Sequence, residues 1–353
     1  MTTVREDAAA DVRPGEELDL GALAAFLRDR LQLDGPVQVQ QFPRGFSNLT
    51  YLVTVGDLEL VLRRPPAGVA KGVAHDMGRE FRILRALHRA GVAVPEPLTD
   101  GDEAAGLGAP FYVMRRVRGV ILRQPSPALA AVLSPKTMQQ LGHAFVETLA
   151  SIHEVPREAE GIAELGKPDG YVRRQVEGWT ARWQRARTDD VGDMEALAAW
   201  LAARAPAESG AALVHNDFKY DNCLLDPADL TRIVAVLDWE MATVGDPLLD
   251  LGTSLGYWLE AGDPPELMAL GLGITALPGS PSRAALWAAY GVRRGLAMPP
   301  MAWYRAFGLF KIAVIAQQIY ARWKTGHAKD PRFGALLGAV RLLAAQGAAA
   351  ASG

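Results

Sequence analysis

The chain has 353 residues, of which 49% are hydrophobic, so it can bury the cores of two lobes or domains. A formal net charge of −3, without a basic stripe of interleaved aromatic residues, argues against a nucleic-acid-binding protein. The one cysteine, Cys223, excludes a disulfide framework and a cysteine metal site, and it favours a reducing, cytoplasmic location.

The N-terminal third predicts a helix followed by a small sheet. Residues 1–17 are acidic and alanine-rich, lack the apolar core of a signal peptide, and are expected to be disordered. Residues 18–31 have apolar side chains at helical spacing and predict an amphipathic helix. Residues 37–42, 51–55 and 58–62 predict three strands, and the last two form a hairpin.

The loop between the first two of these strands has residues that suit a phosphate-binding loop. Gly45 lets the backbone approach a ligand closely, and Ser47 and Asn48 offer hydroxyl and amide donors. An ordinary hairpin loop is the alternative interpretation.

Further along, a helix and two more strands complete the first lobe. The helix carries Glu80 beside an apolar face of Phe81, Leu84 and Leu87. Residues 94–98 and 110–117 predict the last two strands.

The rest of the chain predicts mainly helices. One of them ends at His153, which we expect to be packed in the core and not to be a ligand. Residues 303–324 predict the longest helix. Residues 347–353 are expected to be a disordered tail. The sequence contains no uncharged apolar run of about 18 residues, so it predicts no membrane span.

The most informative stretch is residues 213–240. Short apolar runs lead to His215 and, further on, to Asp238, and a hairpin between these positions would bring Asn222 near Asp238. A carboxamide and a carboxylate together offer the hard oxygen ligands that Mg²⁺ prefers, and Asp217 would then meet an incoming nucleophile. The alternative is that Asp217 and Asn222 only cap a turn and that Asp238 only ends a strand.

The helix after this stretch has a clear start signal. Asp246 is placed to cap its N-terminus, and Pro247 suits the first helical position. Asp246 and Asp250 are therefore predicted to support the neighbouring loops structurally.

The spacing His215-x-Asp217-x4-Asn222, followed by Asp238, resembles the aminoglycoside phosphotransferase-like branch of the protein-kinase fold. The resemblance implies a two-lobed α+β fold, with a small antiparallel-sheet N-lobe at residues 18–117 and a mostly helical C-lobe at residues 118–346. It further implies that ATP and Mg²⁺ are the cofactors. In that scheme Asp217 is the base, Lys219 offsets charge on the transferred phosphoryl group, and Asn222 and Asp238 hold the metal.

The same resemblance assigns nucleotide-binding positions to the first lobe. Arg63 stands where kinases usually have lysine, with Glu80 as its expected partner, although neighbouring Arg64 remains an alternative. Ser47 and Asn48 would cover the phosphates. Backbone groups near the hinge residues Met114, Arg115 and Val117 would bind adenine.

Two helical segments resemble a narrower group, the phosphotransferase domain fused to some acyl-CoA dehydrogenases and its free-standing bacterial relatives. They are the pattern Tyr171-x-x-Arg174-Gln175-x-x-x-Trp179 and residues 303–324. This resemblance implies that the acceptor is the hydroxyl of a hydroxyacyl chain or its CoA thioester.

Charge in the C-terminal region supports the same acceptor class. Residues 251–353 contain ten Lys and Arg residues against four Asp and Glu residues, which disfavours a polycationic acceptor. An aminoglycoside or amino-alcohol kinase and a nucleotide-binding pseudokinase remain the alternatives. The preference between ATP and GTP and the oligomeric state stay open.

Overall fold

The computed structural model describes residues 6–43, 48–66, 75–124 and 126–352. The chain divides into two compact units, and the one that we call the N-terminal unit comprises residues up to 121, 158–164 and 222–242. The remaining residues, 122–157, 165–221 and 243–353, form the C-terminal unit. The division thus differs from the single boundary expected between residues 117 and 118, because residues 222–242 group with the first unit.

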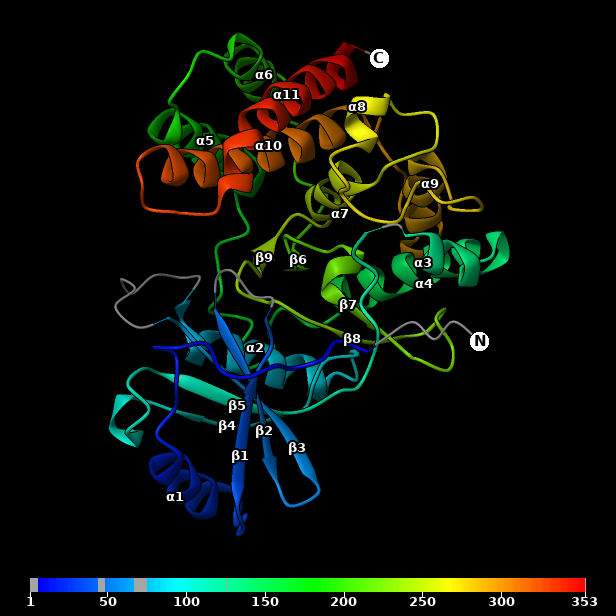
Figure 1. Cartoon of the computed structure of the whole chain (residues 1–353). Coiled ribbons are helices and arrows are strands. Elements are labelled where there is room, and N and C mark those ends of the chain that lie inside the picture. The colour runs from blue at the N-terminus through cyan, green and yellow to red at the C-terminus, as the bar shows by residue number, and fades with distance from the viewer. Residues whose placement is uncertain (1–5, 44–47, 67–74, 125, 353) are drawn as a thin grey trace. The chain divides into compact units, whose positions relative to one another are not determined.

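The N-terminal unit is built on a five-stranded antiparallel sheet with the strand order β1-β2-β3-β5-β4 (Figure 1). Its strands lie at or near the predicted segments, and the strand predicted at residues 94–98 is displaced to residues 97–101. They are β1 (Val37–Gln41), β2 (Leu49–Val55), β3 (Leu58–Arg64), β4 (Pro97–Gly101) and β5 (Phe111–Arg115).

The two faces of this sheet bury different kinds of side chain. Helix α1 (Leu20–Leu31) buries Leu23 and Leu27 in an apolar core with one face of the sheet, to which Leu62 contributes. Successive residues of a strand point to opposite faces, so Arg63 lies on the other face. That face meets α2 (Met77–Arg89), where the Phe81 and Tyr112 rings lie 6.3 Å apart.

The described part of the N-terminal segment is ordered along the sheet, contrary to the prediction of disorder. Ala10 exchanges two backbone hydrogen bonds of 2.8 Å with Gln41. The Tyr51 hydroxyl donates to the Glu16 carbonyl at 2.6 Å. These bonds to buried positions of the sheet hold residues 6–17, a tertiary interaction that local composition does not reveal.

The predicted hairpin that follows Asn222 is present in the N-terminal unit. Strands β7 (Cys223–Leu225) and β8 (Ile233–Val236) pair antiparallel, and the Val236 amide donates to the Ala93 carbonyl at 2.8 Å. This hairpin therefore joins residues near Asn222 to the segment that precedes β4.

The C-terminal unit is mostly helical. Two short strands, β6 (Ala212–Val214) and β9 (Thr243–Gly245), pair antiparallel within it. Its first helices are α3 (Pro127–Val132), α4 (Pro135–His153), α5 (Tyr171–Ala186), α6 (Gly192–Ala203) and α7 (Pro247–Tyr257). The later ones are α8 (Pro265–Met268), α9 (Arg283–Arg294), α10 (Ala302–Lys324) and α11 (Leu336–Ser352). The described residues also form the 3-10 segments η2 (Glu103–Ala105), η3 (Tyr220–Asn222) and η4 (Pro331–Ala335).

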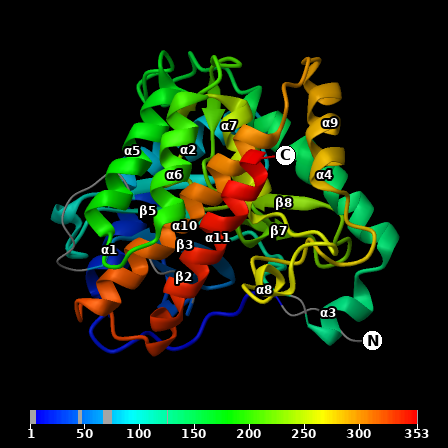
Figure 2. The same cartoon turned by 90° about the horizontal axis from the view of Figure 1, so that it is seen from above.

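Helix α10 lies at the centre of the C-terminal unit, and α5, α7 and α11 all pack against it (Figure 2). Its backbone comes unusually close to α7, because a Cβ added at Gly308 would collide with the Gly252 carbonyl. Only a pair of glycines permits this approach.

The end of the chain is a helix, not the disordered tail that was expected. Residues 347–352 continue α11, and a Cβ at Gly347 would collide with the Leu197 side chain of α6. By length and composition alone, residues 331–352 could also cross a membrane, with a mean hydropathy of 1.4, although the core helices of folded proteins pass the same test. This stretch contains Arg332 and Arg341, so it is not an uncharged apolar run.

Candidate active site

The loop that follows β6 is held by a buried carboxylate on α7. Asp250 accepts hydrogen bonds of 2.7 Å from the backbone amides of both His215 and Asn216. His153 donates to or shares a proton with the same carboxylate at 3.1 Å and also contacts the Tyr290 hydroxyl. His153 is thus the packed core histidine that was predicted.

The supporting role predicted for Asp246 and Asp250 is also found. Asp246 accepts from the Leu249 amide and caps α7, with Pro247 in the first turn. Although burial opposes it, hydrogen bonds from His153 and from the His215 amide keep the pKa of Asp250 below its usual value. A charged Asp250 can therefore anchor the loop at neutral pH.

Asp217 lies in this loop and is paired with Lys219, as their predicted roles require. The Lys219 ammonium donates to both carboxylate oxygens of Asp217, at 2.9 and 2.8 Å. The side chains of Asp217 and Lys219 are 17% and 23% exposed, so both can still be reached by a ligand. A carboxylate in this position can accept a proton, and the adjacent ammonium can offset negative charge.

Tyr257, at the end of α7, is a member of this group that the sequence reasoning missed. The Lys219 ammonium lies 4.4 Å from the centre of its ring. Burial, and then the negative charge of Asp217, raise the pKa of Tyr257, whose hydroxyl donates to that carboxylate. Burial alone would lower the pKa of Lys219, but Tyr257 and Asp217 together raise it above its usual value. The lysine therefore stays charged at neutral pH.

A second group of charged residues lies in the N-terminal unit around Arg63. Its guanidinium contacts Glu80 at 3.1 Å, Asp238 at 2.7 Å and Glu240 at 3.5 Å. Burial alone would lower the pKa of Arg63, but the negative charges of Glu80 and Asp238 raise it above its usual value. Burial likewise raises the pKa of Glu80, and Arg63 offsets part of that effect.

The predicted ion pair between β3 and α2 is therefore present, and Arg63, not Arg64, makes it. Arg64 points to the other face of the sheet, where it donates to the Leu107 carbonyl at 2.6 Å and to the Tyr51 hydroxyl at 3.3 Å. Among the described residues, the buried Nε of Arg63 has no hydrogen-bond partner. This N–H is a donor that a phosphate oxygen could use.

Asn222 and Asp238 flank the β7–β8 hairpin. The Leu237 amide donates to the Asn222 carbonyl at 2.8 Å, which places the two ends of the hairpin side by side. Asp238 has a φ of +66°, a left-handed conformation that non-glycine residues rarely adopt. Such strain is common at functional sites.

The donor set suits magnesium better than a metal bound mainly by protein. Within the described residues, no group of three or more His, Cys, Asp or Glu side chains is placed to hold a metal. Asn222 and Asp238 supply two oxygen-bearing side chains, and Mg²⁺ usually takes few protein ligands besides water and phosphate oxygens. The residues present therefore fit a nucleotide-bound magnesium ion.

The phosphate-loop residues are accounted for in part. Ser47 and Gly45 fall outside the described residues. Asn48 is buried, donates to Glu240 at 3.1 Å and contacts His75 at 2.9 Å. Its amide group thus supports the Arg63 cluster through Glu240, and its contact with a nucleotide stays a prediction.

The predicted hinge residues lie at and after the end of β5. Met114 is buried, and the Arg115 amide donates to the Glu96 carbonyl at 2.9 Å. The Arg115 side chain forms an exposed ion pair with Glu96 at 2.8 Å. The contact of Met114, Arg115 and Val117 with adenine stays a prediction.

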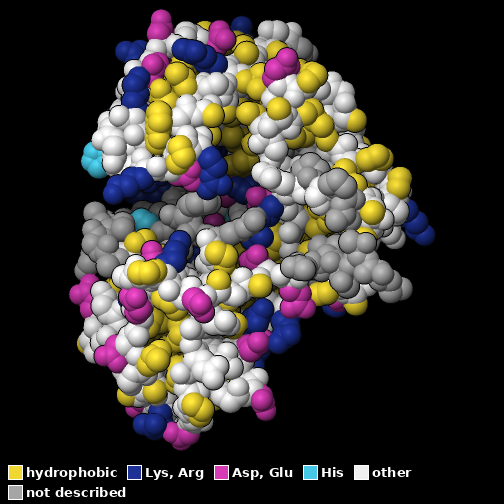
Figure 3. All heavy atoms as spheres, in the orientation of Figure 1, with side chains coloured by type: hydrophobic (Ala, Val, Ile, Leu, Met, Phe, Trp, Pro, Cys, Tyr) yellow, Lys and Arg dark blue, Asp and Glu magenta, His cyan; other side chains and the backbone are white. Residues whose placement is uncertain are grey.

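Half of the basic residues counted in residues 251–353 form ion pairs within the fold. Five of the ten basic residues form ion pairs: Arg283 with Glu260 and Asp263, Arg293 with Glu147 and Glu154, Arg305 with Asp263, Lys324 with Asp189, and Arg332 with Asp330. On the face shown in Figure 3, basic and acidic side chains are interspersed. A simple charge count therefore overstates the attraction of this region for anions.

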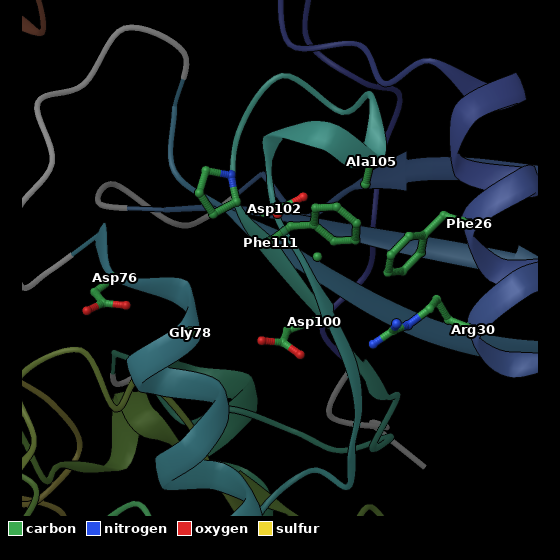
Figure 4. A pocket seen from close by; sticks show the side chains of 10 residues that line it. Phe26, Arg30, Asp76, Gly78, Asp100, Asp102, Ala105 and Phe111 are labelled. Carbon is green, nitrogen blue, oxygen red and sulfur yellow. The ribbon is translucent and has the colours of Figure 1, made fainter. Parts of the chain in front are cut away.

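A separate pocket of about 480 Å³ opens in the N-terminal unit beside α1 and the start of α2 (Figure 4). None of the predicted site residues that the structure describes lines it. Two of its carboxylates already cap helices, since Asp76 accepts from the Arg79 amide and Asp102 from the Ala104 amide. The pocket is therefore distinct from both charged groups described above.

Comparisons with known proteins agree on one family. Residues 38–297 match the family described as "Phosphotransferase enzyme family". The chain is 35% identical over 325 residues to acyl-CoA dehydrogenase family member 10 of Mus musculus, and 35% identical over 337 residues to acyl-CoA dehydrogenase family member 11 of Gallus gallus. These matches cover 90% and 92% of this chain but only 30% and 42% of those proteins, so the chain spans less than half of their length.

Solved structures establish the fold. A Ralstonia eutropha protein provisionally named an aminoglycoside phosphotransferase superimposes with a TM-score of 0.81 at 29% identity, covering 95% of this chain and 99% of that one. Aminoglycoside phosphotransferase APH(4)-Ia, solved with AMP-PNP and hygromycin B, superimposes with a TM-score of 0.58 at 18% identity, covering 94% and 98% of the two chains. The predicted α+β, protein-kinase-like fold is confirmed.

Proposed function

The chain belongs to the phosphotransferase enzyme family and is a small-molecule phosphotransferase, and we propose that it transfers the γ-phosphoryl group of ATP to a hydroxyl group with the aid of Mg²⁺. The observation that carries this proposal is the Asp217–Lys219 pair, held in a loop that Asp250 anchors through two backbone amides. Neither a turn-capping role nor a surface ion pair requires such support.

Asp217 orients the acceptor hydroxyl and accepts its proton as the oxygen attacks phosphorus. Lys219 offsets the negative charge of the transferred phosphoryl group, and Tyr257 holds both side chains in position. Phosphoryl transfer depends mainly on positioning and electrostatic stabilisation, so a carboxylate and an ammonium at 2.8 Å are well matched to it.

The N-terminal unit supplies the nucleotide side. Arg63, set by Glu80, donates to the phosphates of ATP, and Asn222 and Asp238 hold the metal. When bound, Mg²⁺ would offset the negative charge of the phosphate groups. Solved relatives of this fold contain AMP-PNP or ADP, which supports ATP over an unrelated donor.

The acceptor that we propose is a hydroxyl on an acyl chain or its CoA thioester. Support comes from the relatives that join this domain to an acyl-CoA dehydrogenase, since fused domains commonly share a ligand class. The buried lone cysteine agrees with activity in a reducing cytoplasm.

A polycationic acceptor is less well matched by the helices after the catalytic loop. Residues 251–353 contain four acidic side chains, and three of them already pair with arginine: Glu260 and Asp263 with Arg283, and Asp330 with Arg332. An aminoglycoside needs carboxylates that its ammonium groups can reach. The engagement of these acids with arginine is therefore stronger support for an acyl acceptor than the number of basic and acidic residues in this region.

A transfer assay tests the proposal. Purified protein is incubated with γ-³²P-ATP and Mg²⁺ and with a panel of hydroxyacyl-CoAs, free hydroxy acids, sugars and aminoglycosides. We expect label on a hydroxyacyl compound, abolished by EDTA and in Asp217→Asn, and unchanged in Asp193→Asn, which alters an exposed acid on α6. Label on aminoglycosides alone would reject the acyl acceptor, and nucleotide binding without transfer to any compound would favour a pseudokinase.

A further inference from the structure

Lys311, in the middle of α10, is a buried lysine that the proposed chemistry does not use. Only 1% of its surface is exposed. Its ammonium donates to the Asn216 carbonyl at 2.5 Å and lies 5.3 Å from the centre of the Trp179 ring on α5. Burial lowers the pKa of Lys311 to about 8, although Asp217 and Asp250 oppose the shift.

Such a lysine is costly for a helix core. Methionine or leucine would pack at this position without the desolvation of an ammonium group, and buried ion pairs are often less stable than apolar replacements. A hydrogen bond to a backbone carbonyl and a cation–π contact compensate only part of that cost. A lysine at this buried position therefore points to a role besides packing.

The carbonyl that Lys311 contacts belongs to the peptide group directly before Asp217. A peptide group is planar, so fixing its carbonyl and its amide fixes the direction in which the next residue leaves it. Here Lys311 holds the Asn216 carbonyl, and the Asp217 amide donates to His215 Nδ1 at 3.2 Å. Hydrogen bonds thus hold both the carbonyl and the amide of this peptide group.

Asn216 itself needs this restraint. It has a φ of +67°, a left-handed conformation that costs free energy in any residue except glycine. Its amide nitrogen is bound by Asp250 at 2.7 Å, and its side chain contacts the Tyr171 hydroxyl at 3.0 Å. Lys311 supplies the remaining restraint, on the carbonyl.

These contacts explain the two segments that resemble the narrower group. Tyr171 and Trp179 come from the first segment, and Lys311 comes from the second. The Tyr171 ring fits because Gly245 of β9 has no side chain there. All of them meet around Asn216, so the two segments converge on the backbone of the catalytic loop.

We propose that Lys311 is a positioning residue that holds the Asn216–Asp217 peptide group, and thereby the Asp217 carboxylate, in the orientation that phosphoryl transfer requires. The proposal rests on the proposed role of Asp217 as the base. The charged groups that act on Lys311 come from three elements: Asp217 and Lys219 from the loop, Asp250 from α7 and Arg182 from α5.

The test compares Lys311→Met, which keeps chain length but removes the donor, with Lys311→Arg, which keeps a cation, and with Tyr171→Phe. Lys324→Met is the matched control, since it removes an exposed lysine from the last turn of the same helix. Three quantities are measured in each: the melting temperature, amide hydrogen exchange in the peptide spanning residues 212–219, and phosphate release from Mg·ATP with water as the acceptor.

We expect Lys311→Met to remain folded, to exchange the amides of residues 215–217 at least about tenfold faster, and to lose roughly 10- to 100-fold in kcat with little change in the KM for ATP. Lys311→Arg should recover part of kcat, Tyr171→Phe should change exchange in the same direction by less, and Lys324→Met should match the wild type.

Two outcomes would overturn the inference. One is exchange in residues 215–217 that is unchanged in a folded Lys311→Met protein. The other is a kcat that falls only in proportion to the folded fraction, which would make Lys311 a stabilising residue alone. If Lys311→Met does not fold, the same two criteria are applied to the other variants. Unchanged exchange in residues 215–217 of Tyr171→Phe, or a kcat of Lys311→Arg that falls only in proportion to its folded fraction, would overturn the inference. A wild type inactive toward every acceptor would instead reject the proposed function, while the exchange comparison would still decide whether Lys311 holds the loop.

Discussion

The two charged groups of this protein are held in place by different means. Around Arg63, in the N-terminal unit, the contacts are ion pairs between side chains. The Arg63 guanidinium contacts the carboxylates of Glu80, Asp238 and Glu240. Around Asp217, in the C-terminal unit, buried side chains hold the backbone, since Asp250 and Lys311 bind peptide groups of the loop. We therefore expect the first group to rearrange when a charged ligand enters and the second to keep its backbone conformation.

The difference has a chemical reason. A nucleotide brings several negative charges, so its site benefits from a cation whose partners can be exchanged for phosphate oxygens and a metal. A general base must point in one direction during transfer, so rigid backbone support is more useful to it. Both groups contain one residue in the left-handed region, Asp238 and Asn216, at φ values of +66° and +67°.

The largest effect should come from removing the base. Asp217→Asn keeps the size of the side chain but cannot accept a proton, so we expect kcat to fall on the order of 10³-fold or more. Calorimetric titration with Mg·ATP should still give a Kd close to that of the wild type. A variant that turns over at the normal rate would remove Asp217 from the mechanism.

The adjacent arginines of β3 provide a matched pair for the nucleotide side. Arg63→Gln should lower kcat/KM for ATP roughly 100-fold, because it removes a cation from the phosphates and leaves Glu80 buried without its partner. Arg64→Gln should lower the melting temperature but leave the Kd for ATP unchanged, since Arg64 donates to the Leu107 and Glu16 carbonyls and to the Tyr51 hydroxyl, on the other face of the sheet from Arg63. The reverse pattern would assign nucleotide binding to Arg64.

Removing the anchor of the catalytic loop should affect stability in a pH-dependent way. Asp250→Asn should cost about 3 kcal/mol of unfolding free energy at pH 7, because a buried charge that accepts several hydrogen bonds is lost. The folded pKa of Asp250 is depressed, so its contribution is present above the unfolded pKa and is lost as the pH falls through the folded value. Urea titrations at pH 7 and pH 3 should therefore show a smaller difference between the two proteins at pH 3.

An equal difference at both pH values would mean that Asp250 acts without its charge. Asp193→Asn serves as the control, since its exposed side chain on α6 should change the unfolding free energy by no more than a few tenths of a kcal/mol, on the order of a typical surface substitution.

The smallest effect concerns Tyr257. Tyr257→Phe retains the ring near Lys219 but removes the hydroxyl next to Asp217, so kcat should fall only about fivefold, the loss of one hydrogen bond of about 1 kcal/mol. The KM for ATP should not change. A loss as large as that of Asp217→Asn would instead give the Tyr257 hydroxyl a direct part in proton transfer.

Local sequence patterns predicted much of this arrangement. Apolar runs and turn signals indicated the five strands, alternation put Arg63 on the face of α2, and the Asp246-Pro247 pair marked the start of α7. Spacing alone identified the Asp217 and Asn222 loop. Each of these features depends on residues that are close in the chain or on a fixed strand period.

Features that depend on distant contacts could not be predicted in the same way. Nothing local marks Lys311 or Tyr257 as neighbours of the loop, since both lie on helices that read as core. The charge count over residues 251–353 failed for the same reason, because Arg293 pairs with acids of α4 and Lys324 with Asp189. The ordered ends of the chain likewise depend on β1 and α6.

The most direct test of the central claim follows the acceptor oxygen. A hydroxyacyl-CoA labelled with ¹⁸O in its hydroxyl is incubated with Mg·ATP and the protein, and the phosphorylated product is analysed by mass spectrometry. If the acceptor oxygen attacks the γ-phosphorus under the control of Asp217, the product keeps the ¹⁸O, and Asp217→Asn forms little of it. Loss of the label, or ADP formation without any phosphorylated acceptor, would contradict phosphoryl transfer to this hydroxyl.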